Sequence, residues 1–190
     1  MGSVPPRFGQ LRVGRLIHDG DWDVAAQVIP DWTSTMNNSP FGFELEVTQT
    51  ALFPTDPNLV YYPLVYLHGR GTFSFTDAER EALRRHLWPG GGTLFADAGC
   101  GSADFDAVFR RFVAELMPNN PLVPIPRDDV LYTTTIGADL SAVRYTKATG
   151  GNRDFPHLEG VKIDGHWAII YSKYGIDCAW ENDHDEGCQG

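Results

Sequence analysis

Cys100 is the residue of this chain best placed for covalent chemistry. It lies in Ala98-Gly99-Cys100-Gly101-Ser102, after an apolar run and before a run of helical periodicity. A thiol between glycines at a strand-to-helix turn fits a nucleophile elbow, in which the next backbone N–H, here that of Gly101, stabilises an oxyanion. The start of the following helix would favour the thiolate. Cys100 is therefore a candidate nucleophile of a hydrolase or amidase.

No motif supplies the base that this chemistry requires. His157, His166 and His184 follow Cys100 in the sequence, but none lies in a pattern that fixes it beside the thiol. A buried or disulfide-linked cysteine at a tight turn explains the same residues. The sequence therefore favours a domain that binds over one that catalyses, and a Cys100-dependent enzyme is the alternative.

A second polar turn, Asp19-Gly20-Asp21-Trp22-Asp23, follows the first apolar segment. Carboxylates at alternate positions are typical of the start of a calcium loop, but the later glycine and glutamate of such a loop are absent. We expect Asp19, Asp21 and Trp22 to contribute to a polar ligand site. Solvated carboxylates that cap a helix are the alternative.

The other candidate ligand-binding residues lie in two glycine turns and near a late strand. The turn His68-Gly69-Arg70-Gly71 follows an apolar run, and a histidine held by backbone groups explains His68 equally. Asp97 ends another apolar run, where a buried carboxylate needs a hydrogen-bond partner. The remaining candidates are Gly101, Ser102 and Tyr171, and core packing is the alternative for the tyrosine.

The C-terminal segment holds three residues of types that bind zinc, Cys178, His184 and Cys188. Their spacing matches no standard zinc motif, and a loose acidic tail is the alternative. We therefore expect no cofactor, with zinc at these residues as the alternative of an interaction module. Three cysteines are too few for a disulfide scaffold and leave the compartment undecided.

A regular alternation of strands and helices positions these residues. From Tyr61 to Leu116 the chain reads as strand, glycine turn, capped helix, triple glycine, strand and capped helix, which predicts a parallel βαβα unit. Thr76 and Glu79 form a capping box, and Ser102 can cap the second helix. Because parallel strands end at one edge, the turns after both strands are expected to meet there, where α/β folds place ligands.

The flanking segments predict further elements. Leu11–Ile17 reads as a strand, residues 24–36 as a helix that Pro30 divides, and residues 43–47 as an edge strand. Prolines between Pro118 and Pro126 give an extended connector, which leads to a short strand near Val130–Ile136. Asp164-Gly165 predicts a hairpin between Val161–Ile163 and Trp167–Tyr171.

Length and composition bound the function. With 190 residues and 42% hydrophobic residues, the chain is expected to form one domain over residues 1–190, with a tail at 1–9, a surface loop insertion at 137–156 and an acidic tail at 175–190. The net charge of −10 disfavours nucleic acid as a partner. No segment has the roughly 20 apolar residues that span a bilayer, so we expect a soluble domain.

Several ordered motifs together resemble a bacterial family catalogued only as a numbered domain of unknown function. The resemblance extends from about Leu11 to Cys188. It rests on Asp19-Gly20-Asp21-Trp22, Tyr62-Pro63-Leu64-Val65-Tyr66-Leu67-His68-Gly69, Phe75-Thr76-Asp77-Ala78-Glu79, Gly90-Gly91-Gly92, the segment Asp97 to Ser102, and Tyr171-Ser172-Lys173-Tyr174.

That family is similar in fold to class I glutamine amidotransferases and to ThuA-like proteins, which implies a flavodoxin-like, mostly parallel sheet with helices on both faces, here with a C-terminal β-hairpin. The amidotransferase pattern Gly-x-Cys-x-Gly is altered around Cys100, and no His-x-Glu pair follows on a late strand. The resemblance thus implies a domain without the amidotransferase triad. It also implies an exported or envelope-associated parent protein, with the cytoplasm as the alternative, and a chain shorter than its relatives.

The patterns predict an α/β domain that binds at the carboxyl edge of its sheet, and the resemblance implies that this domain is flavodoxin-like. The expected partner is a small polar ligand, of which a carbohydrate is one example, or a protein. The candidate residues come from the turns Asp19 to Trp22, His68 to Gly71 and Asp97 to Ser102.

Overall fold

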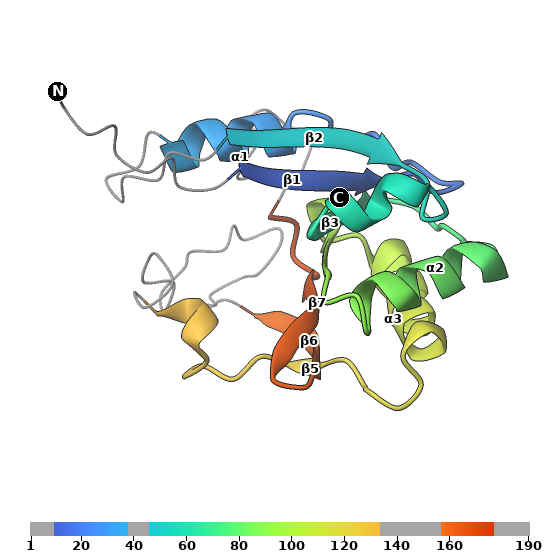
Figure 1. The fold of residues 1–190 in the computed structure, drawn as a ribbon. Helices are drawn as coiled ribbons and strands as arrows, with labels where there is room; N and C mark the ends of the chain where they lie inside the picture. The colour runs from blue at the N-terminus through green and yellow to red at the C-terminus, as the bar shows by residue number, and fades with distance from the viewer. Residues whose placement is uncertain (1–9, 38–45, 134–156, 177–190) are drawn as a thin grey trace, which may run out of the picture.

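The computed structural model describes residues 10–37, 46–133 and 157–176, and these residues form an α/β fold around one mixed sheet (Figure 1). The sheet has seven strands in the order β2-β1-β3-β4-β7-β6-β5. The strands are β1 (Gln10–Leu16), β2 (Glu46–Leu52), β3 (Leu64–Gly69), β4 (Thr93–Ala98), β5 (Val123–Pro124), β6 (Leu158–Ile163) and β7 (His166–Ser172). The helices are α1 (Val28–Asn37), α2 (Asp77–Leu87) and α3 (Ala103–Leu116), with short 3₁₀ turns η1 (Pro57–Tyr61), η2 (Gly99–Gly101) and η3 (Val130–Tyr132).

Most of the sheet is parallel. The pairs β2–β1, β1–β3, β3–β4 and β4–β7 are parallel, whereas β6 runs antiparallel to both β7 and β5. This confirms the α/β class, the mostly parallel sheet and the parallel βαβα unit of residues 61–116. The predicted hairpin is also confirmed, since β6 and β7 are joined by Asp164 (φ 49°) and Gly165 (φ 84°), both in the left-handed region that a tight two-residue turn requires.

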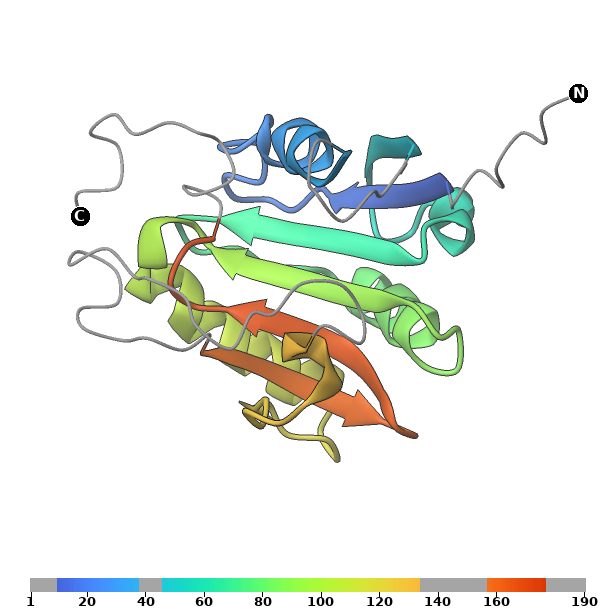
Figure 2. The same ribbon diagram turned by 90° about the vertical axis from the view of Figure 1, so that its left-hand side faces the viewer.

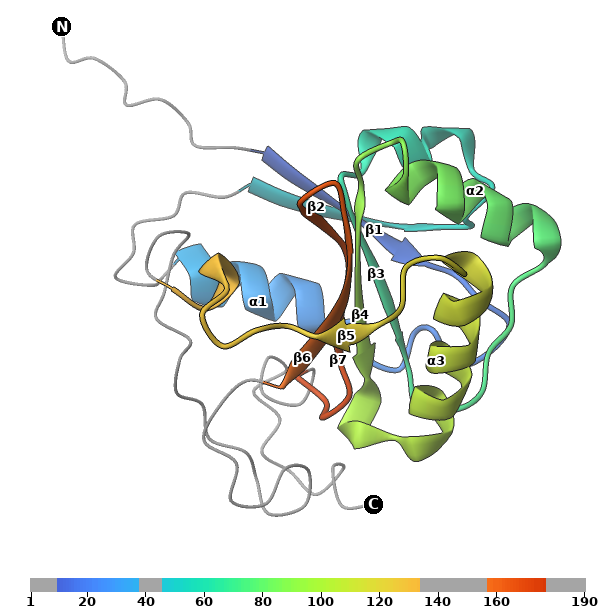
Figure 3. The ribbon, with the colours of Figure 1, turned by 90° about the horizontal axis from the view of Figure 1, so that it is seen from below.

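Helices cover both faces of the sheet (Figure 3). On one face α2 and α3 pack on the larger core, which includes Leu83 and Phe109. On the other face α1 packs through Val28 and Ile29 on a smaller core around Val13. The central strands β3 and β4 are mostly buried, which explains the continuous apolar run of β3.

Local signals explain where the helices begin and end. The Thr76 hydroxyl accepts from the Glu79 N–H while the Glu79 carboxylate accepts from the Thr76 N–H, which is the predicted capping box of α2. The Ser102 hydroxyl accepts from the Phe105 N–H and caps α3, as predicted. Beyond α2 the three glycines form a turn in which the Gly92 N–H donates to the carbonyl of His86.

Two elements differ from their sequence predictions. The first helix begins only at Val28, so Pro30 lies in its first turn and divides nothing, because the N–H groups of a first turn have no helical partner in any case. Val130–Tyr132 forms a 3₁₀ turn instead of the start of a strand, because the Asp129 carboxylate accepts from the Leu131 N–H and caps the turn. The predicted edge strand is β2, which begins at Glu46 and lies at the edge of the sheet.

Some sequence predictions lie outside the described residues. These are the surface loop at 137–156, the N-terminal tail at 1–9 and most of the acidic C-terminal tail. Within the described part of the chain, no helix is both long and apolar enough to cross a bilayer.

Candidate functional site

The polar turns meet at one edge of the sheet, as the sequence predicts. In the β3–β4 register His68 lies beside Asp97 and Gly69 beside Ala98, so both strands end together. Figure 2 shows β3, β4 and β7 running in the same direction. The two turns also touch, because the Ser102 hydroxyl donates to the carbonyl of Arg70. We call this the carboxyl edge and the opposite one the amino edge.

Asp21, in the turn after β1, binds the turn after β3. Its carboxylate accepts from the N–H of Arg70 (2.9 Å) and from the N–H of Gly71 (3.2 Å). A Cβ at Gly69 would lie 2.8 Å from Asp21 Oδ1, so only glycine allows this approach. Burial would raise the pKa of Asp21, but the two backbone hydrogen bonds outweigh it and hold the pKa below its ordinary value. The glycine turn therefore holds a carboxylate of the chain itself.

Asp19 and His18 also form hydrogen bonds to neighbouring segments, Asp19 to Ser74 and His18 to His68. Asp19 accepts from the hydroxyl and the N–H of Ser74, and these bonds lower its pKa. His18 Nδ1 accepts from the Gly20 N–H, so Nε2 carries the proton and donates to the carbonyl of His68 at 2.9 Å. Burial lowers the pKa of His18 and keeps its ring neutral. These contacts make the turn after β1 a fixed part of the edge.

Trp22 lies half-buried next to these carboxylates. The guanidinium of Arg15 lies over its ring, 5.2 Å from the centroid, and also pairs with Asp23. A cation over an indole is a favourable contact at a partly exposed position. The aromatic face of Trp22 is therefore already in contact with a side chain of the protein.

Cys100 has an uncommon backbone conformation. Its φ of 52° and ψ of 23° lie in the left-handed region, which non-glycine residues rarely adopt. The side chain is half-buried. A Cβ at Gly99 would lie 2.8 Å from His68 Nε2, so the imidazole of His68 packs against the residue that precedes the thiol.

The segment after β7 lies over the elbow. A Cβ at Gly175 (φ 69°) would lie 2.8 Å from the backbone nitrogen of Cys100 and 3.0 Å from that of Gly101. The predicted oxyanion donor therefore faces a backbone segment of the chain. Asp97, fully buried, holds this segment by accepting from the Ile176 N–H at 3.0 Å, which gives the carboxylate the partner that its burial requires.

The histidines named as potential bases lie apart. His166 Nε2 is within hydrogen-bond distance of Thr93 Oγ1 and of the Gly92 carbonyl, at the amino edge. His157 lies at the carboxyl edge, with its ring 6.1 Å from that of Tyr174. His184 lies outside the described residues. His166 therefore lies at the edge opposite Cys100, whereas His157 lies at the same edge as Cys100.

Tyr171 lies in the core. It is fully buried, its ring stacks on that of Phe109 at 4.2 Å, and its hydroxyl donates to Asp106 at 2.9 Å. Burial raises the pKa of the phenol. Tyr171 thus packs in the core, as the alternative interpretation of this residue states. Ligand binding by the other candidate residues stays a prediction.

A pocket that the sequence analysis missed adjoins these turns at the carboxyl edge. It has a volume of about 370 Å³ and lies between the end of β7 and the start of β6, beside residues 124–127. Its polar lining consists of Arg127, His157, Glu159, Lys173 and Tyr174. The missed signal is the basic pair formed by Arg127, directly after the prolines, and Lys173, directly after the last parallel strand.

The predicted zinc ligands Cys178, His184 and Cys188 lie outside the described residues. Within the described part of the chain, no group of three or more His, Cys, Asp or Glu side chains is arranged to hold a metal ion. Zinc binding by the C-terminal segment therefore stays a prediction.

The fold defines an α/β domain whose mostly parallel sheet brings several polar turns to one edge. The model of the family described as a domain of unknown function, DUF4159, matches residues 7–189, and the chain belongs to this family. The expected membership of a numbered family of unknown function is thereby confirmed. No curated protein matches the chain.

Proposed function

We propose that this chain binds a small, acidic polar ligand, such as a sugar acid, in the pocket between β7 and the β5–β6 segment. The observation that carries the proposal is the basic lining of this pocket, which lies at the edge where α/β folds place ligands. The volume of about 370 Å³ suits a monosaccharide-sized molecule. We refer to it as the carboxyl-edge pocket.

Charge at the pocket supports an acidic ligand. Arg127, His157 and Lys173 line it in a chain whose net charge is −10. Among the described lining residues the carboxylate is that of Glu159, and the two terminal nitrogens of Arg110 donate to its two oxygens at 3.1 and 2.5 Å. Within the described lining, basic side chains therefore outnumber carboxylates.

The aromatic ring of Tyr174 supports a ligand with a flat apolar face. The Lys173 ammonium lies 5.1 Å from the centroid of this ring, so one cation and one ring are adjacent. A sugar acid offers both a carboxylate for the cation and a C–H face for the ring. The turns after β1 and β3, in contrast, are already joined by the carboxylate of Asp21.

Isothermal titration with glucuronate, and with glucose as the neutral control, tests this function. We expect glucuronate to bind and glucose to bind more weakly, because only the acid pairs with the cations. Lys173→Gln and Arg127→Gln are each expected to weaken glucuronate binding about ten-fold or more, the effect of one charge-assisted hydrogen bond. The matched control is Arg111→Gln, an exposed cation on α3 outside this pocket.

The proposal fails if glucuronate and a panel of related sugar acids give no heat. It also fails if Arg111→Gln weakens binding as much as the two pocket variants, because the effect would then reflect net charge alone.

The second candidate is a Cys100-dependent hydrolase or amidase. The observation that favours it is the left-handed backbone of Cys100 at a strand-to-helix turn, a conformation that costs about 1–3 kcal/mol and is found at functional sites. Rates of iodoacetamide labelling at several pH values test it. An activated thiol reacts faster than free cysteine at pH near 6, whereas labelling at the rate of free cysteine removes this candidate.

We also propose that the fold is flavodoxin-like and related to that of the amidotransferase and ThuA-like proteins. The order of the five parallel strands, β2-β1-β3-β4-β7, is the order 2-1-3-4-5 of flavodoxin-like sheets when β7 counts as the fifth. The sequence resemblance alone supports an exported or envelope-associated parent protein.

A further inference from the structure

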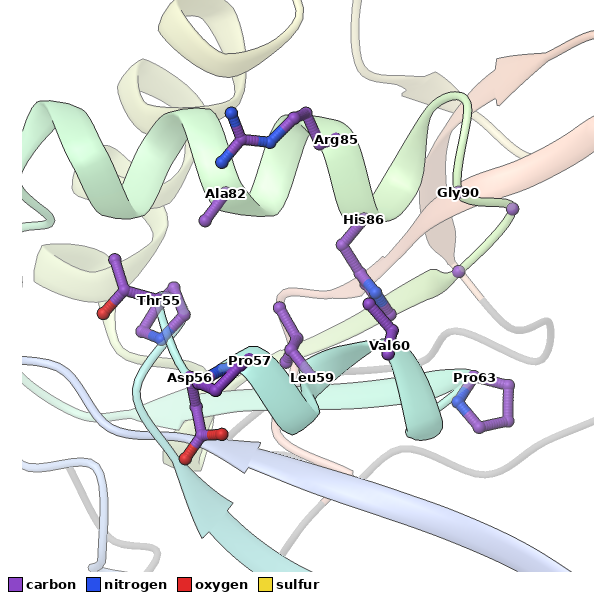
Figure 4. A pocket seen from close by; sticks show the side chains of 13 residues that line it. Thr55, Asp56, Pro57, Leu59, Val60, Pro63, Ala82, Arg85, His86 and Gly90 are labelled. Carbon is purple, nitrogen blue, oxygen red and sulfur yellow. The ribbon is translucent and has the colours of Figure 1, made fainter.

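A second pocket lies at the amino edge, between η1 and the C-terminal half of α2 (Figure 4). Its volume is about 490 Å³, within the range of small-molecule sites. Pro63 and Gly92, which line it, directly precede β3 and β4. This pocket is thus at the opposite end of the strands from the carboxyl-edge pocket.

His86 gives this pocket a polar group with unused hydrogen-bonding capacity. Its side chain is 8% exposed, and its Nε2 atom is buried without a hydrogen-bond partner among the described residues. Figure 4 shows the ring pointing from α2 toward η1. A Cβ at Gly92 would lie 2.3 Å from Nε2, so the ring lies directly against the glycine turn. A buried nitrogen of this kind costs stability unless a ligand or water pairs with it.

The polar lining of this pocket also includes a second hydrogen-bond donor, the guanidinium of Arg85. The guanidinium of Arg85 lies 3.7 Å from Glu81, which pairs more closely with Arg84 at 2.5 Å. The Asp56 carboxylate accepts from the Asn58 N–H as the cap of η1, and Figure 4 shows it directed away from α2. His86 is therefore the polar side chain directed into the pocket, whereas Arg85 lines its rim with the guanidinium extending along α2 (Figure 4).

The walls of the pocket are apolar. They are formed by Pro54, Pro57, Leu59, Val60, Pro63 and Ala82. Burying a hydrocarbon group against such walls is favourable by about 25 cal/mol per Å² of apolar surface. The pocket therefore combines an apolar body with one donor-rich end.

We propose that this pocket binds a small monocarboxylic acid with an apolar body. The carboxylate accepts a hydrogen bond from His86 Nε2 and is favoured by the positive charge of Arg85 at the rim, while the body packs on the prolines and on Val60. The arrangement satisfies the buried imidazole nitrogen and covers the apolar walls at once.

Titration calorimetry with benzoate and hexanoate tests this site, with benzyl alcohol as a neutral probe of matched size. We expect saturable benzoate binding in the millimolar range or tighter, and weaker binding of benzyl alcohol. His86→Phe keeps the ring volume but removes the nitrogens, and is expected to weaken benzoate binding about ten-fold or more. Arg85→Gln is expected to weaken benzoate about three-fold and to leave benzyl alcohol unchanged. The control Arg111→Gln, an exposed cation on α3 outside both pockets, is expected to change neither.

A readout on the wild-type protein accompanies the variants, in case one of them does not fold. The imidazole NMR signals of His86 are expected to shift on addition of benzoate and to shift less with benzyl alcohol. Absence of saturable benzoate binding, equal benzoate affinity of His86→Phe, or equal affinity for the alcohol each overturns the proposal. Loss of benzoate binding in Arg111→Gln also overturns it, because the effect would then reflect net charge alone.

Discussion

At the carboxyl edge of the sheet, carboxylates accept hydrogen bonds from backbone N–H groups, whereas at the amino edge a buried imidazole nitrogen has no such partner among the described residues. Asp21 and Asp97 hold loops together. His86 holds nothing through Nε2. The difference separates polar groups that serve the fold from one that is available to a ligand. Removing the carboxylates is therefore expected to lower the free energy of unfolding, whereas removing the imidazole is expected to change it little.

The largest effect on stability is expected from Gly175→Ala, which disturbs the packing of the segment after β7 on the backbone of Cys100. The added Cβ would meet the backbone of Cys100 at 2.8 Å, and the φ of 69° is unfavourable for alanine. We expect a loss of about 2–4 kcal/mol in the free energy of unfolding, measured by urea denaturation. Gly165→Ala is the control, because its φ is 84° but nothing lies within 4 Å; about 1 kcal/mol is expected there. Equal losses of stability in the two variants would show that the contact between Gly175 and the backbone of Cys100 does not contribute to stability.

Asp21→Asn is expected to have the next largest effect. The amide keeps one oxygen, so one of the two backbone N–H groups of the β3 turn loses its acceptor, and the charge is lost as well. We expect a loss of about 1–3 kcal/mol in the free energy of unfolding. Asp23→Asn, an exposed partner of Arg15, is the control and is expected to change stability by less than about 1 kcal/mol. A null result for Asp21→Asn would mean that the turn is held by other contacts.

Acid pH probes the same carboxylates without mutation. The folded-state pKa values of Asp19 and Asp21 lie below the ordinary 3.8, so the unfolded chain binds protons first as the pH falls. Their stabilisation is complete above this value and is lost as the pH falls through the folded-state pKa. We expect the stability difference between wild type and Asp21→Asn to shrink below pH 3.8. A constant difference down to pH 2, within about 0.3 kcal/mol, would contradict the assignment.

The smallest effect is expected at the amino edge. His86→Phe removes a buried nitrogen that has no partner, so stability at pH 8 is expected to change by less than about 1 kcal/mol. Burial lowers the pKa of His86, which means that its neutral form is the one the fold favours. Stability of the wild type is therefore complete above pH 6.5 and falls as the pH drops through the folded-state pKa, and His86→Phe is expected to reduce this fall. The residual slope comes from His18, whose pKa is also lowered.

Periodic and capping signals predicted the fold well. The βαβα unit, the capping box of α2 and the Asp164-Gly165 turn are local patterns, in which a few neighbouring residues determine the backbone. Pro30 was misjudged because one residue does not tell whether a helix has already begun. The 3₁₀ turn at Val130 was missed because its cap, Asp129, is a single side chain.

The candidate site was harder to predict, because it depends on contacts between segments far apart in the chain. Sequence placed Asp21 and Gly69 at the same edge, but not the pairing of this carboxylate with the turn 50 positions later. The carboxyl-edge pocket combines Arg127 with Lys173, from a proline connector and the end of β7. No local pattern joins two such segments.

The most direct test of the account is an amide NMR titration of the protein with glucuronate. We expect the largest shift changes at Arg127, at Lys173 and Tyr174, and at residues 157–159, which line the carboxyl-edge pocket. Changes concentrated at Asp21, Arg70 and Gly71 would contradict the account, because the ligand would then bind at the turns that the chain's own carboxylate joins.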